Sequence, residues 1–397
     1  MTSAAPIDAV APRPVAAALP TAAPDLEAGG GVRLRAYRED DVEAVLAMAS
    51  EAEFARWTTV PVPYGREDAE GFVRDVVPAG WATGEAMTWA LDVDGEHAGN
   101  VALRRTGTDG VLSVGYGLDA RHRGRGAVSA ALRVLLPWAA EHGAAAVRWS
   151  AHAGNWPSRR AAWAAGFRVE GTIRRAEAPS LLMKARGELR DCWVGTWVAG
   201  DPTAPATPWL DVPRVDLGDV VLRPWRDEDA GRVVEACTDP VTRRWLPRLP
   251  ERYELQDARD FVEGMRRDAA EAHAVAWCAA DARDDRCLAS VTLFALGQGG
   301  RPAEIGYWAH PDARGRGVVT TGVRAVARHA LLPAEVGGLG LPAVLVRAEP
   351  GNAASRAVAL RAGFAPAGWD LAGGGEPDDP PTPLDRFVLR AQDLPDA

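Results

Sequence analysis

The sequence predicts a mixed α/β fold that is present twice in tandem, each copy being a central, mixed and mostly antiparallel sheet flanked by helices. Two observations predict the duplication. The motifs Arg123-Gly-Arg-Gly126 and Arg314-Gly-Arg-Gly317 each follow a strand-like segment and open an apolar helical run. The segments around the two motifs also match one another in the same order along the chain. A chain of 397 residues is long enough for two domains that each bury their own core.

The internal match covers most of the chain. The spacing between matched segments grows along the second copy, which indicates insertions in loops such as the glycine-rich stretch 337–340. The matched pairs are 34–41 with 222–229, Trp57 with Trp245, Trp89 with Trp277, Asn155 with Asn352, Ser158 with Ser355, and 165–167 with 362–364.

Proline-rich composition marks the predicted domain boundaries. The first residues are rich in Ala and Pro and lack the basic segment of a secretory signal, so we expect a disordered tail at 1–28. Prolines also crowd the stretch that follows the first copy. We therefore expect domains at 29–199 and 215–392, joined by a Pro-rich linker at 200–214.

Hydrophobic periodicity predicts the elements of the first copy in order. Val42, Val45 and Ala49 share one face of a helix, and Gly166 suits the end of a short one. Strands often follow one another without a helix between them, which disfavours a doubly wound parallel sheet. The expected elements are strand 32–36, helices 40–49 and 66–77, strands 88–93, 97–104 and 112–118, helix 127–142, strand 146–152, helix 156–165, and strands 167–173 and 191–198.

Composition excludes several classes of protein. A net charge of −9 disfavours general nucleic-acid binding, although it attracts cationic, amine-bearing substrates. No apolar run approaches the roughly 20 residues that span a bilayer, so we expect no membrane segment and a cytoplasmic protein. The four cysteines show neither paired spacing nor a Cys/His cluster, so we expect free thiols and no metal site.

The glycine motif favours an anion site but does not fit the common phosphate loops. A dinucleotide fingerprint needs a third glycine where Ser129 and Thr320 stand, and neither copy has the Gly-Lys-Ser/Thr of a Walker loop. A basic surface turn is the plainer alternative for a single motif. Two motifs in matching context, each at the start of a helix, favour anion binding.

The motifs and the residues that follow them resemble the GNAT acetyltransferases, in particular the RimJ/RimL-like branch that acetylates the N-termini of ribosomal proteins. The resemblance rests on the two arginine–glycine motifs with their helices, and on Asn155-Trp-Pro-Ser158 and Asn352-Ala-Ala-Ser355, each ahead of Ala-Gly-Phe. It covers nearly everything from 31 to 389. Both copies depart from the family pattern at its last small-residue position, where a valine stands.

The resemblance implies a site for acetyl-CoA, or for another short acyl-CoA, in each copy. Backbone N–H groups of the glycine turn would hold the pyrophosphate at the helix N-terminus, with arginines adding positive charge. The strand before each turn would pair with the pantetheine arm, and one of its N–H groups would stabilise the oxyanion. The implied residues are Val114, Tyr116, Arg123, Gly124, Arg125, Gly126, Ala127, Val128, Asn155 and Ser158, and in the second copy Ile305, Tyr307, Arg314, Gly315, Arg316, Gly317, Val318, Val319, Asn352 and Ser355.

Transfer to an amine needs a base, because an alkyl ammonium group titrates near 10.4. Glu304 is the candidate base in the second copy, with a solvated strand residue as the plainer alternative, and the first copy has Ser113 in its place. By resemblance, Ser158 and Ser355 would protonate the leaving thiolate. Hydrogen bonding at the start of the short helix is the alternative role for both serines.

Other matched residues also have two interpretations. Asn155 and Asn352 resemble the family residue that bonds the pantetheine, and they suit helix caps equally well. The matched tryptophans line an acceptor pocket or pack in the core, and for Trp89 and Trp277 we expect the core.

The predicted activity is N-acetyl transfer from acetyl-CoA to a primary amine, either a protein N-terminus or a small molecule, by direct attack on the thioester. Glu304, Ser355 and Ser158 are the predicted catalytic residues. The alternative is that one or both copies bind CoA without turnover and serve as an assembly or acyl-CoA sensing module.

Overall fold

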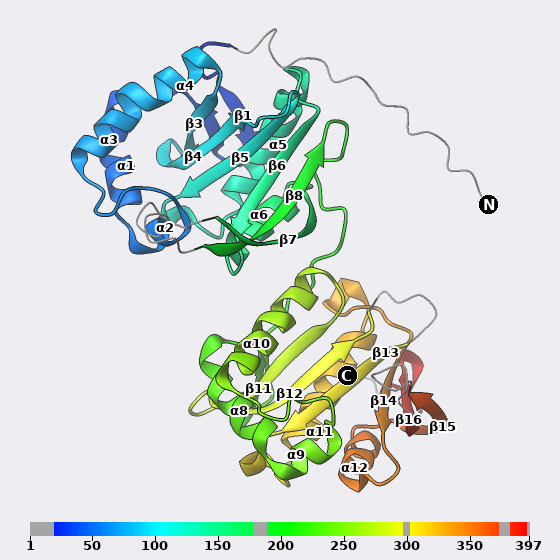
Figure 1. Cartoon of the computed structure of the whole chain (residues 1–397). Helices are drawn as coiled ribbons and strands as arrows, with labels where there is room; N and C mark the ends of the chain where they lie inside the picture. The colour runs from blue at the N-terminus through cyan, green and yellow to red at the C-terminus, as the bar shows by residue number, and fades with distance from the viewer. Residues whose placement is uncertain (1–19, 178–188, 297–301, 373–381, 395–397) are drawn as a thin grey trace, which may run out of the picture. The chain divides into compact units, whose positions relative to one another are not determined.

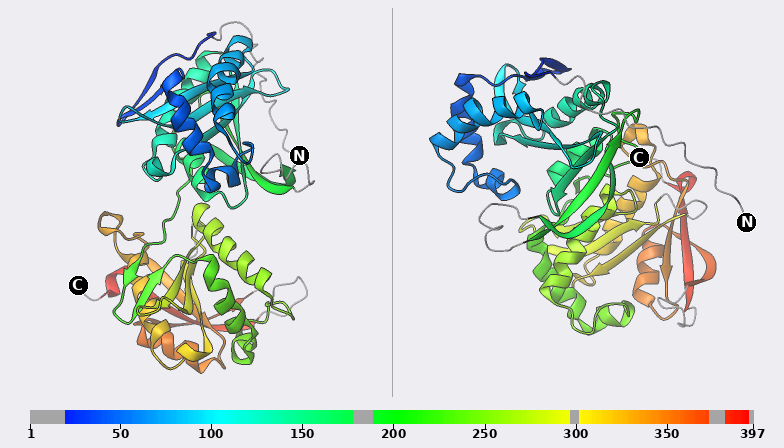
Figure 2. Two further views of the ribbon diagram at one scale, coloured as in Figure 1. Left: turned by 90° about the vertical axis from the view of Figure 1, so that its left-hand side faces the viewer. Right: turned by 45° about the horizontal axis from the view of Figure 1, so that its top comes forward.

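The computed structural model describes residues 20–177, 189–296, 302–372 and 382–394 (Figure 1). The chain divides into two compact units, 1–206 and 207–397, and each is described by itself. In both, helices lie against the two faces of one twisted sheet (Figures 1 and 2). This is the fold class that the sequence predicts.

The first unit contains one eight-stranded sheet in the order β1-β2-β3-β4-β5-β6-β8-β7. Among its described strands, β5 and β6 are the only parallel neighbours, and every other pair is antiparallel. The strands are β1 (Leu26–Gly29), β2 (Val32–Arg35), β3 (Ala86–Val93), β4 (Glu96–Arg105), β5 (Val111–Leu118), β6 (Ala146–His152), β7 (Arg168–Glu177) and β8 (Arg190–Val198). The helices are α1 (Val42–Ala49), α2 (Ala52–Trp57), α3 (Arg66–Gly71), α4 (Val77–Thr83), α5 (Ala127–Glu141) and α6 (Trp156–Ala164).

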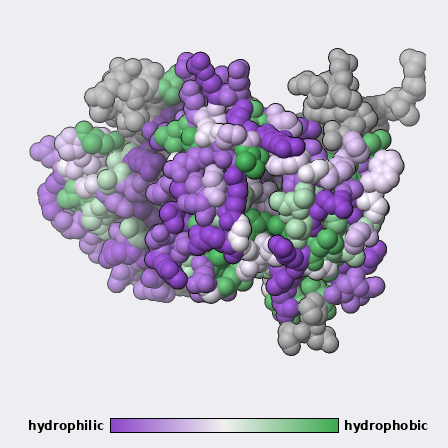
Figure 3. Space-filling view, turned by 90° about the horizontal axis from the view of Figure 1, so that it is seen from below, coloured by the Kyte–Doolittle hydropathy of each residue, from purple (hydrophilic) through white to green (hydrophobic). Residues whose placement is uncertain are grey.

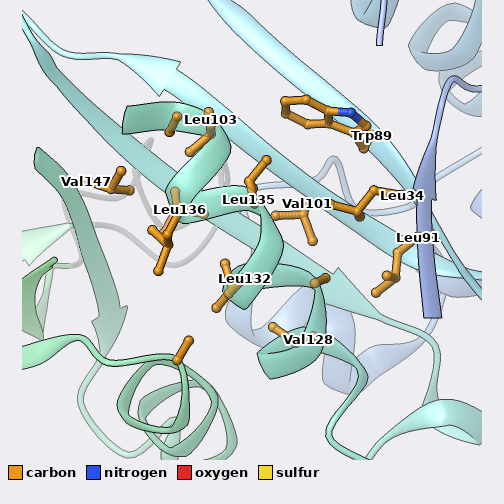
Figure 4. Close-up of a cluster of buried hydrophobic side chains, with 14 of the residues drawn as sticks. Leu34, Trp89, Leu91, Val101, Leu103, Val128, Leu132, Leu135, Leu136 and Val147 are labelled. Carbon is orange, nitrogen blue, oxygen red and sulfur yellow. The ribbon is translucent and has the colours of Figure 1, made fainter. Parts of the chain in front are cut away.

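Helix α5 builds the main core of the first unit. Its apolar side, which includes Leu132, Leu135 and Leu136, packs on strand residues such as Val101 and Val147, all of them fully buried (Figure 4). Helices α1 and α3 form a smaller apolar cluster away from α5, around Val45 and Val73. Because side chains alternate along a strand, each strand of this sheet presents one set of residues toward α5 and another set away from it.

The second unit repeats this arrangement with the strand order β15-β16-β14-β13-β12-β11-β10-β9. Here β13 and β14 are the parallel pair. The strands are β9 (Val215–Asp216), β10 (Val220–Arg223), β11 (Val275–Asp281), β12 (Cys287–Phe294), β13 (Ala303–Ala309), β14 (Ala343–Ala348), β15 (Ala365–Ala372) and β16 (Thr382–Arg390). The helices are α8 (Ala230–Thr238), α9 (Pro240–Trp245), α10 (Leu255–Ala270), α11 (Val318–Leu331) and α12 (Ala353–Arg361). Helix α11 packs into the main cluster on one face, and α8 and α10 pack into a second cluster on the other.

Several elements differ from the sequence expectation. Strand β1 lies within the predicted tail, and Trp89 Nε1 donates to the carbonyl of Pro24 at 3.0 Å, so this part of the tail packs on the sheet. In the same way Trp277 donates to Pro213 at 2.9 Å, inside the predicted linker. Helix α2 was not expected, and the predicted helix 66–77 continues to Thr83 through a π-helical turn. The domain boundaries themselves remain predictions.

The surface and the cysteines add little that is specific. On the face drawn in Figure 3, hydrophilic residues predominate and hydrophobic ones are scattered among them, as is usual for a protein surface. Within the described ranges, no helix has both the length and the apolar character needed to cross a membrane. All four cysteines are buried and form no disulfide.

Candidate active site

Two neighbouring parallel strands separate in each sheet. Strands β5 and β6 are paired for four residues, ending at Val114 opposite Trp149, although β5 runs on to Leu118. In the second unit the pairing of β13 with β14 ends at Glu304 opposite Leu345. Past these points no described strand pairs with this edge of β5 or of β13. The backbone groups along that edge are therefore available to an extended ligand.

A glycine turn follows β5 and leads into α5. Gly124 and Gly126 have φ angles of 76° and 77°, a left-handed conformation that glycine adopts without steric cost. Gly126 is the N-cap of α5 and offers no side-chain cap, and no described residue accepts a hydrogen bond from the backbone N–H groups of 124–129. A Cβ at either glycine would meet nothing within 4 Å. The turn thus presents a row of donors in open space at a helix N-terminus, which suits an anion.

The second unit repeats the turn. Gly315 and Gly317 have φ angles of 76° and 77°, and Gly317 is the N-cap of α11. Among the described residues, nothing accepts from the N–H groups of Gly315 or 317–320. The predicted cofactor residues of the two turns therefore occupy equivalent positions, and their role in binding remains a prediction.

Two of the four arginines in these turns serve the turns themselves. Arg123 forms a two-pronged ion pair with Glu51, at 2.9 and 2.6 Å, and donates to the carbonyl of Leu118. Arg314 forms an ion pair with Asp239 and a hydrogen bond to the Thr242 hydroxyl at 2.8 Å. The first turn of the neighbouring helix thus holds the glycine loop in place. These two guanidinium groups already have carboxylate partners, and the charge that they would add to an anion site remains a prediction.

The remaining two arginines are the more accessible cations of the turns. Arg125 is exposed and has no ion-pair partner among the described residues. Arg316 is exposed and lies 3.4 Å from Asp281, at the long end of hydrogen bonding.

A tyrosine on the separated strand meets the predicted serine in both units. The Tyr116 hydroxyl lies 3.0 Å from Ser158 Oγ and donates to its carbonyl at 2.9 Å. The Tyr307 hydroxyl lies 2.8 Å from Ser355 Oγ and 3.1 Å from its carbonyl. Burial raises the pKa of Tyr307 to about 12 and raises that of Tyr116 further. Both tyrosines are therefore neutral hydroxyl groups at physiological pH.

The asparagines cap the short helices that carry these serines. Asn155 Oδ1 accepts from the backbone N–H of Ser158 at 3.2 Å, and Asn352 Oδ1 accepts from that of Ser355 at 3.0 Å. The capping alternative is thus present in the structure for both asparagines. The serine hydroxyls are not the capping groups.

The serines differ in a further contact. In the first unit the indole of Trp149 donates to Ser158 Oγ at 3.2 Å. In the second unit β14 has Val346 where β6 has Trp149. Val346 follows Leu345, the partner of Glu304, and Trp149 follows Arg148, the partner of the equivalent Ser113. Ser158 Oγ therefore receives an extra donor that Ser355 lacks.

Glu304 lies at the point where β13 leaves β14, and it is paired with Arg347. The Arg347 Nε donates to Glu304 Oε2 at 2.7 Å, and a second nitrogen lies at 2.6 Å. Burial raises the pKa of the Glu304 carboxyl above its ordinary value, and the arginine offsets part of that rise. The group is thus a half-buried carboxylate held by a cation, rather than a solvated strand residue.

The first unit lacks both members of this pair. By strand register, Ser113 occupies the position of Glu304, because they pair with Arg148 and Leu345 at equivalent places. Two residues further along these partner strands lie Ser150 and Arg347, so Ser150 occupies the position of Arg347. The second unit therefore has both members of the ion pair, and the first unit has neither. Sequence reasoning found Glu304 but missed Arg347, because no sequence pattern sets its place on β14, two residues past the Leu345 that pairs with Glu304.

The matched tryptophans divide into a fully buried pair and a half-buried pair. Trp89 and Trp277 are 0% and 1% exposed, which confirms that they belong to the core. Trp57 and Trp245 are half-buried and end the short helices α2 and α9. Their rings lie 3.7 Å from where a Cβ would stand on Gly154 and Gly351, in the loops ahead of α6 and α12.

Sequence reasoning missed one other side-chain role. Tyr116 and Tyr307 were expected only as backbone partners on the strand edge, whereas their hydroxyls bond the serines. The signal that could have found this role is a tyrosine matched in both copies at a position that alternation places on the face covered by α5 or α11.

Solved structures similar to the chain each match about one of its units. RimJ of Mycobacterium smegmatis, in complex with a CoA-disulfide, is 21% identical, with 45% of this chain and 87% of that chain covered and a TM-score of 0.38. A Salmonella typhimurium acetyl transferase, described as modifying the N-terminal serine of ribosomal protein L7/L12, is 20% identical, with 44% and 99% covered and a TM-score of 0.39. A GNAT-family acetyltransferase of Bacillus anthracis is 14% identical, with 45% and 99% covered and a TM-score of 0.38.

Comparison by sequence identifies the family. No curated protein matches the chain. The family model for the acetyltransferase (GNAT) domain matches it twice, at residues 32–168 and again at 219–365, and both matches include the glycine turn and the separated strands. The chain therefore belongs to the GNAT acetyltransferases, a family of acyltransferase enzymes, and has two GNAT domains in tandem.

Proposed function

We propose that this protein transfers an acetyl group from acetyl-CoA to a primary amine, by direct attack of the amine on the thioester. The observation that carries the proposal is the pairing of two features in each unit. A row of backbone donors without acceptors lies at a helix N-terminus, and the strand that leads into it has an unpaired edge. One extended ligand with an anionic end fits both.

The residues of each turn would bind the cofactor's pyrophosphate. Oriented N–H groups and the helix dipole favour negative charge there, and Arg125 or Arg316 adds a nearby cation. The pantetheine arm would pair with the edge of β5 or β13 as an added strand. This arrangement brings the thioester to the point where the two parallel strands separate.

In the second unit, the Tyr307–Ser355 pair and Glu304 approach that point from opposite faces of the sheet. Ile305 packs in the α11 cluster and Trp308 in the α8–α10 cluster. Alternation therefore places Tyr307 on the α11 face with Ile305, and Glu304 on the other face with Trp308. The acceptor amine would enter on the Glu304 face, and the leaving sulfur would lie near the hydroxyl pair.

This placement assigns the groups that take and give protons during the reaction. The amine must lose a proton as the C–N bond forms, and Glu304 would take it, directly or through water. The C–S bond then breaks, and the thiolate takes a proton from the Ser355 hydroxyl as Ser355 takes one from Tyr307. Solvent returns a proton to Tyr307, and Glu304 releases the amine's proton to solvent. Arg347 holds the Glu304 carboxylate in position.

A specific set of observations favours a second function for the first unit. Ser113 and Ser150 replace the ion pair there, and Trp149 donates to Ser158 Oγ. The first unit would then bind acyl-CoA and transfer the acyl group more slowly than the second unit. The second unit would supply most of the catalytic rate.

The test is the release of free thiol from acetyl-CoA with a panel of amines, including short peptides and small molecules. We expect the wild type to release thiol, and Glu304→Gln and Ser355→Ala each to lower the rate at saturating acetyl-CoA by about a hundredfold. Unchanged rates in both variants would remove the second-unit assignment, and no release with any amine would contradict acetyl transfer.

A further inference from the structure

The two units differ in the side chain that lies over the glycine of the separating strand. In the first unit, a Cβ on Gly115 would stand 2.4 Å from a guanidinium nitrogen of Arg104. In the second, a Cβ on Gly306 would stand 2.8 Å from the ring of Phe294. Strand register makes these equivalent places, because Arg104 pairs with Ser113 and Phe294 with Glu304. A cation thus occupies the position of an aromatic ring.

Arg104 lies on the face of the sheet away from α5. Leu103, Leu112 and Val114 pack in the α5 cluster, so alternation places Arg104 and Gly115 on the opposite face. That is the face on which Glu304 lies in the second unit. Arg104 therefore stands on the side from which an acceptor would approach the thioester.

Arg104 has no counter-charge among the residues that the structure describes. Among the described residues, no carboxylate forms an ion pair with it and no acceptor receives its hydrogen bonds. Its side chain is exposed, yet the protein around it removes water and lowers the pKa of the guanidinium, which stays charged at neutral pH. A partly dehydrated but accessible cation binds an anion more strongly than one in bulk water.

A second arginine extends this charge along the same row. Arg148 pairs with Ser113 from the other side, is exposed, and forms no ion pair with a described residue. Arg104 on β4 and Arg148 on β6 lie on either side of Ser113 on β5. Two inter-strand spacings separate them, so their Cβ atoms are about 10 Å apart. The equivalent residues of the second unit, Phe294 and Leu345, are apolar.

We propose that the first unit binds amine acceptors that carry a carboxylate near the reacting nitrogen, and that Arg104 binds this carboxylate. The inference rests on the proposed function, because that function places the acceptor on this face. Arg148 adds long-range attraction. The second unit, with Phe294 in the same place, has no such preference for an anion.

The test uses two probes of equal size, the α-amides of aspartic acid and of asparagine. Both have the same α-amine, and they differ in a side-chain carboxylate against a carboxamide. Binding of each to the full chain, in the presence of CoA, is measured by titration calorimetry. We expect the aspartic acid amide to bind about tenfold more tightly. We expect that ratio to fall to near one in Arg104→Gln and to persist in part in Arg104→Lys.

Arg105→Gln is the matched control. It removes the same charge from the next residue of β4, which alternation places on the other face, so the ratio should not change. Equal binding of the two amides by the wild type would overturn the inference, as would a preference that survives Arg104→Gln. Acetyl transfer to both amides is followed alongside. A preference without any acetylated product would contradict the proposed function alone, and product without a preference would contradict the carboxylate site alone.

Discussion

The hydroxyl of Tyr307 lies 2.8 Å from Oγ of Ser355, and it joins the separated strand β13 to the start of helix α12. The same pair, Tyr116 with Ser158, recurs in the first unit at 3.0 Å. Because the tyrosine is neutral at physiological pH, the pair can pass a proton to a leaving group provided that solvent returns one to the tyrosine. Several expected outcomes follow from this contact and from its neighbours.

Removal of the Tyr307 hydroxyl should slow acetyl transfer without weakening cofactor binding. Tyr307→Phe leaves Ser355 Oγ without its partner, so we expect kcat to fall about tenfold while KM for acetyl-CoA stays within about twofold. In the double variant with Ser355→Ala the losses should not add, because the two groups act as one unit. Steady-state kinetics measure both effects. Tyr64→Phe, which removes a hydroxyl from the loop ahead of α3, is the control and should leave the rate unchanged.

The acid limb of the rate should report Glu304. Its pKa is raised by burial, so the rate should rise with pH through a value above that of an ordinary carboxyl group, and Glu304→Gln should lose this limb. A pH profile of kcat/KM measures it. A limb that persists in Glu304→Gln would show that another group is the base.

The difference in stability between the wild type and Glu304→Gln should change with pH in one direction. A carboxyl group whose folded pKa is raised contributes stability that is fully present below its unfolded pKa and is lost as pH rises through the folded value. The stability advantage of the wild type over Glu304→Gln should therefore shrink as pH rises from the ordinary range of a carboxyl group through the raised folded pKa. Chemical denaturation at several pH values checks this, and an advantage that grows over this range would contradict the raised pKa.

Alanine in the glycine turn should cost both stability and CoA affinity. Gly317→Ala puts a residue with a side chain at a left-handed backbone position, which costs about 1 kcal/mol. It also restricts the backbone conformations open to the N–H donors that would face the pyrophosphate. We expect CoA binding at the second turn to weaken at least about tenfold. Gly218→Ala is the matched control, since Gly218 has a φ of 86° and open space around its Cβ position. Equal loss of CoA affinity in both variants would contradict a direct role for the turn.

Asp239 should link helix α9 to the second turn in a pH-dependent way. Its hydrogen bond from Arg314 lowers the pKa of the carboxyl group, so its contribution is present above the unfolded pKa and is lost as pH falls through the folded one. Asp239→Ala also removes the N-cap of α9 and should cost about 1 kcal/mol at pH 7. Asp239→Asn keeps the cap, and its deficit against the wild type should begin to shrink as pH falls below the ordinary value of an aspartate, about 3.9, and should vanish only below the lowered folded pKa. Denaturation curves at pH 7 and pH 3 compare the three proteins.

Much of the fold was predictable because the signals are local. Alternating apolar residues predicted β6 at 146–152, the residues that the structure gives, and the duplication predicted the second unit from the first. Strand β1 was not predicted because its four residues lie next to an Ala/Pro-rich stretch. That stretch is held on the sheet by a long-range hydrogen bond from Trp89 to the carbonyl of Pro24. Composition does not report such a contact.

The site was predictable at its turns but not in its pairings. Glycine at positive φ before a helix is a local pattern, so the two turns could be read directly. The Glu304–Arg347 and Arg123–Glu51 pairs join residues 43 and 72 positions apart. No sequence pattern sets their distance. Only strand register and helix packing bring these charges together.

The central claim is that each unit holds one CoA on its glycine turn, and titration calorimetry with CoA tests it most directly. We predict two bound CoA molecules per chain, one weakened at least about tenfold in Gly126→Ala and the other weakened to the same extent in Gly317→Ala. No CoA binding, or two sites whose affinity survives both substitutions together, would contradict the account.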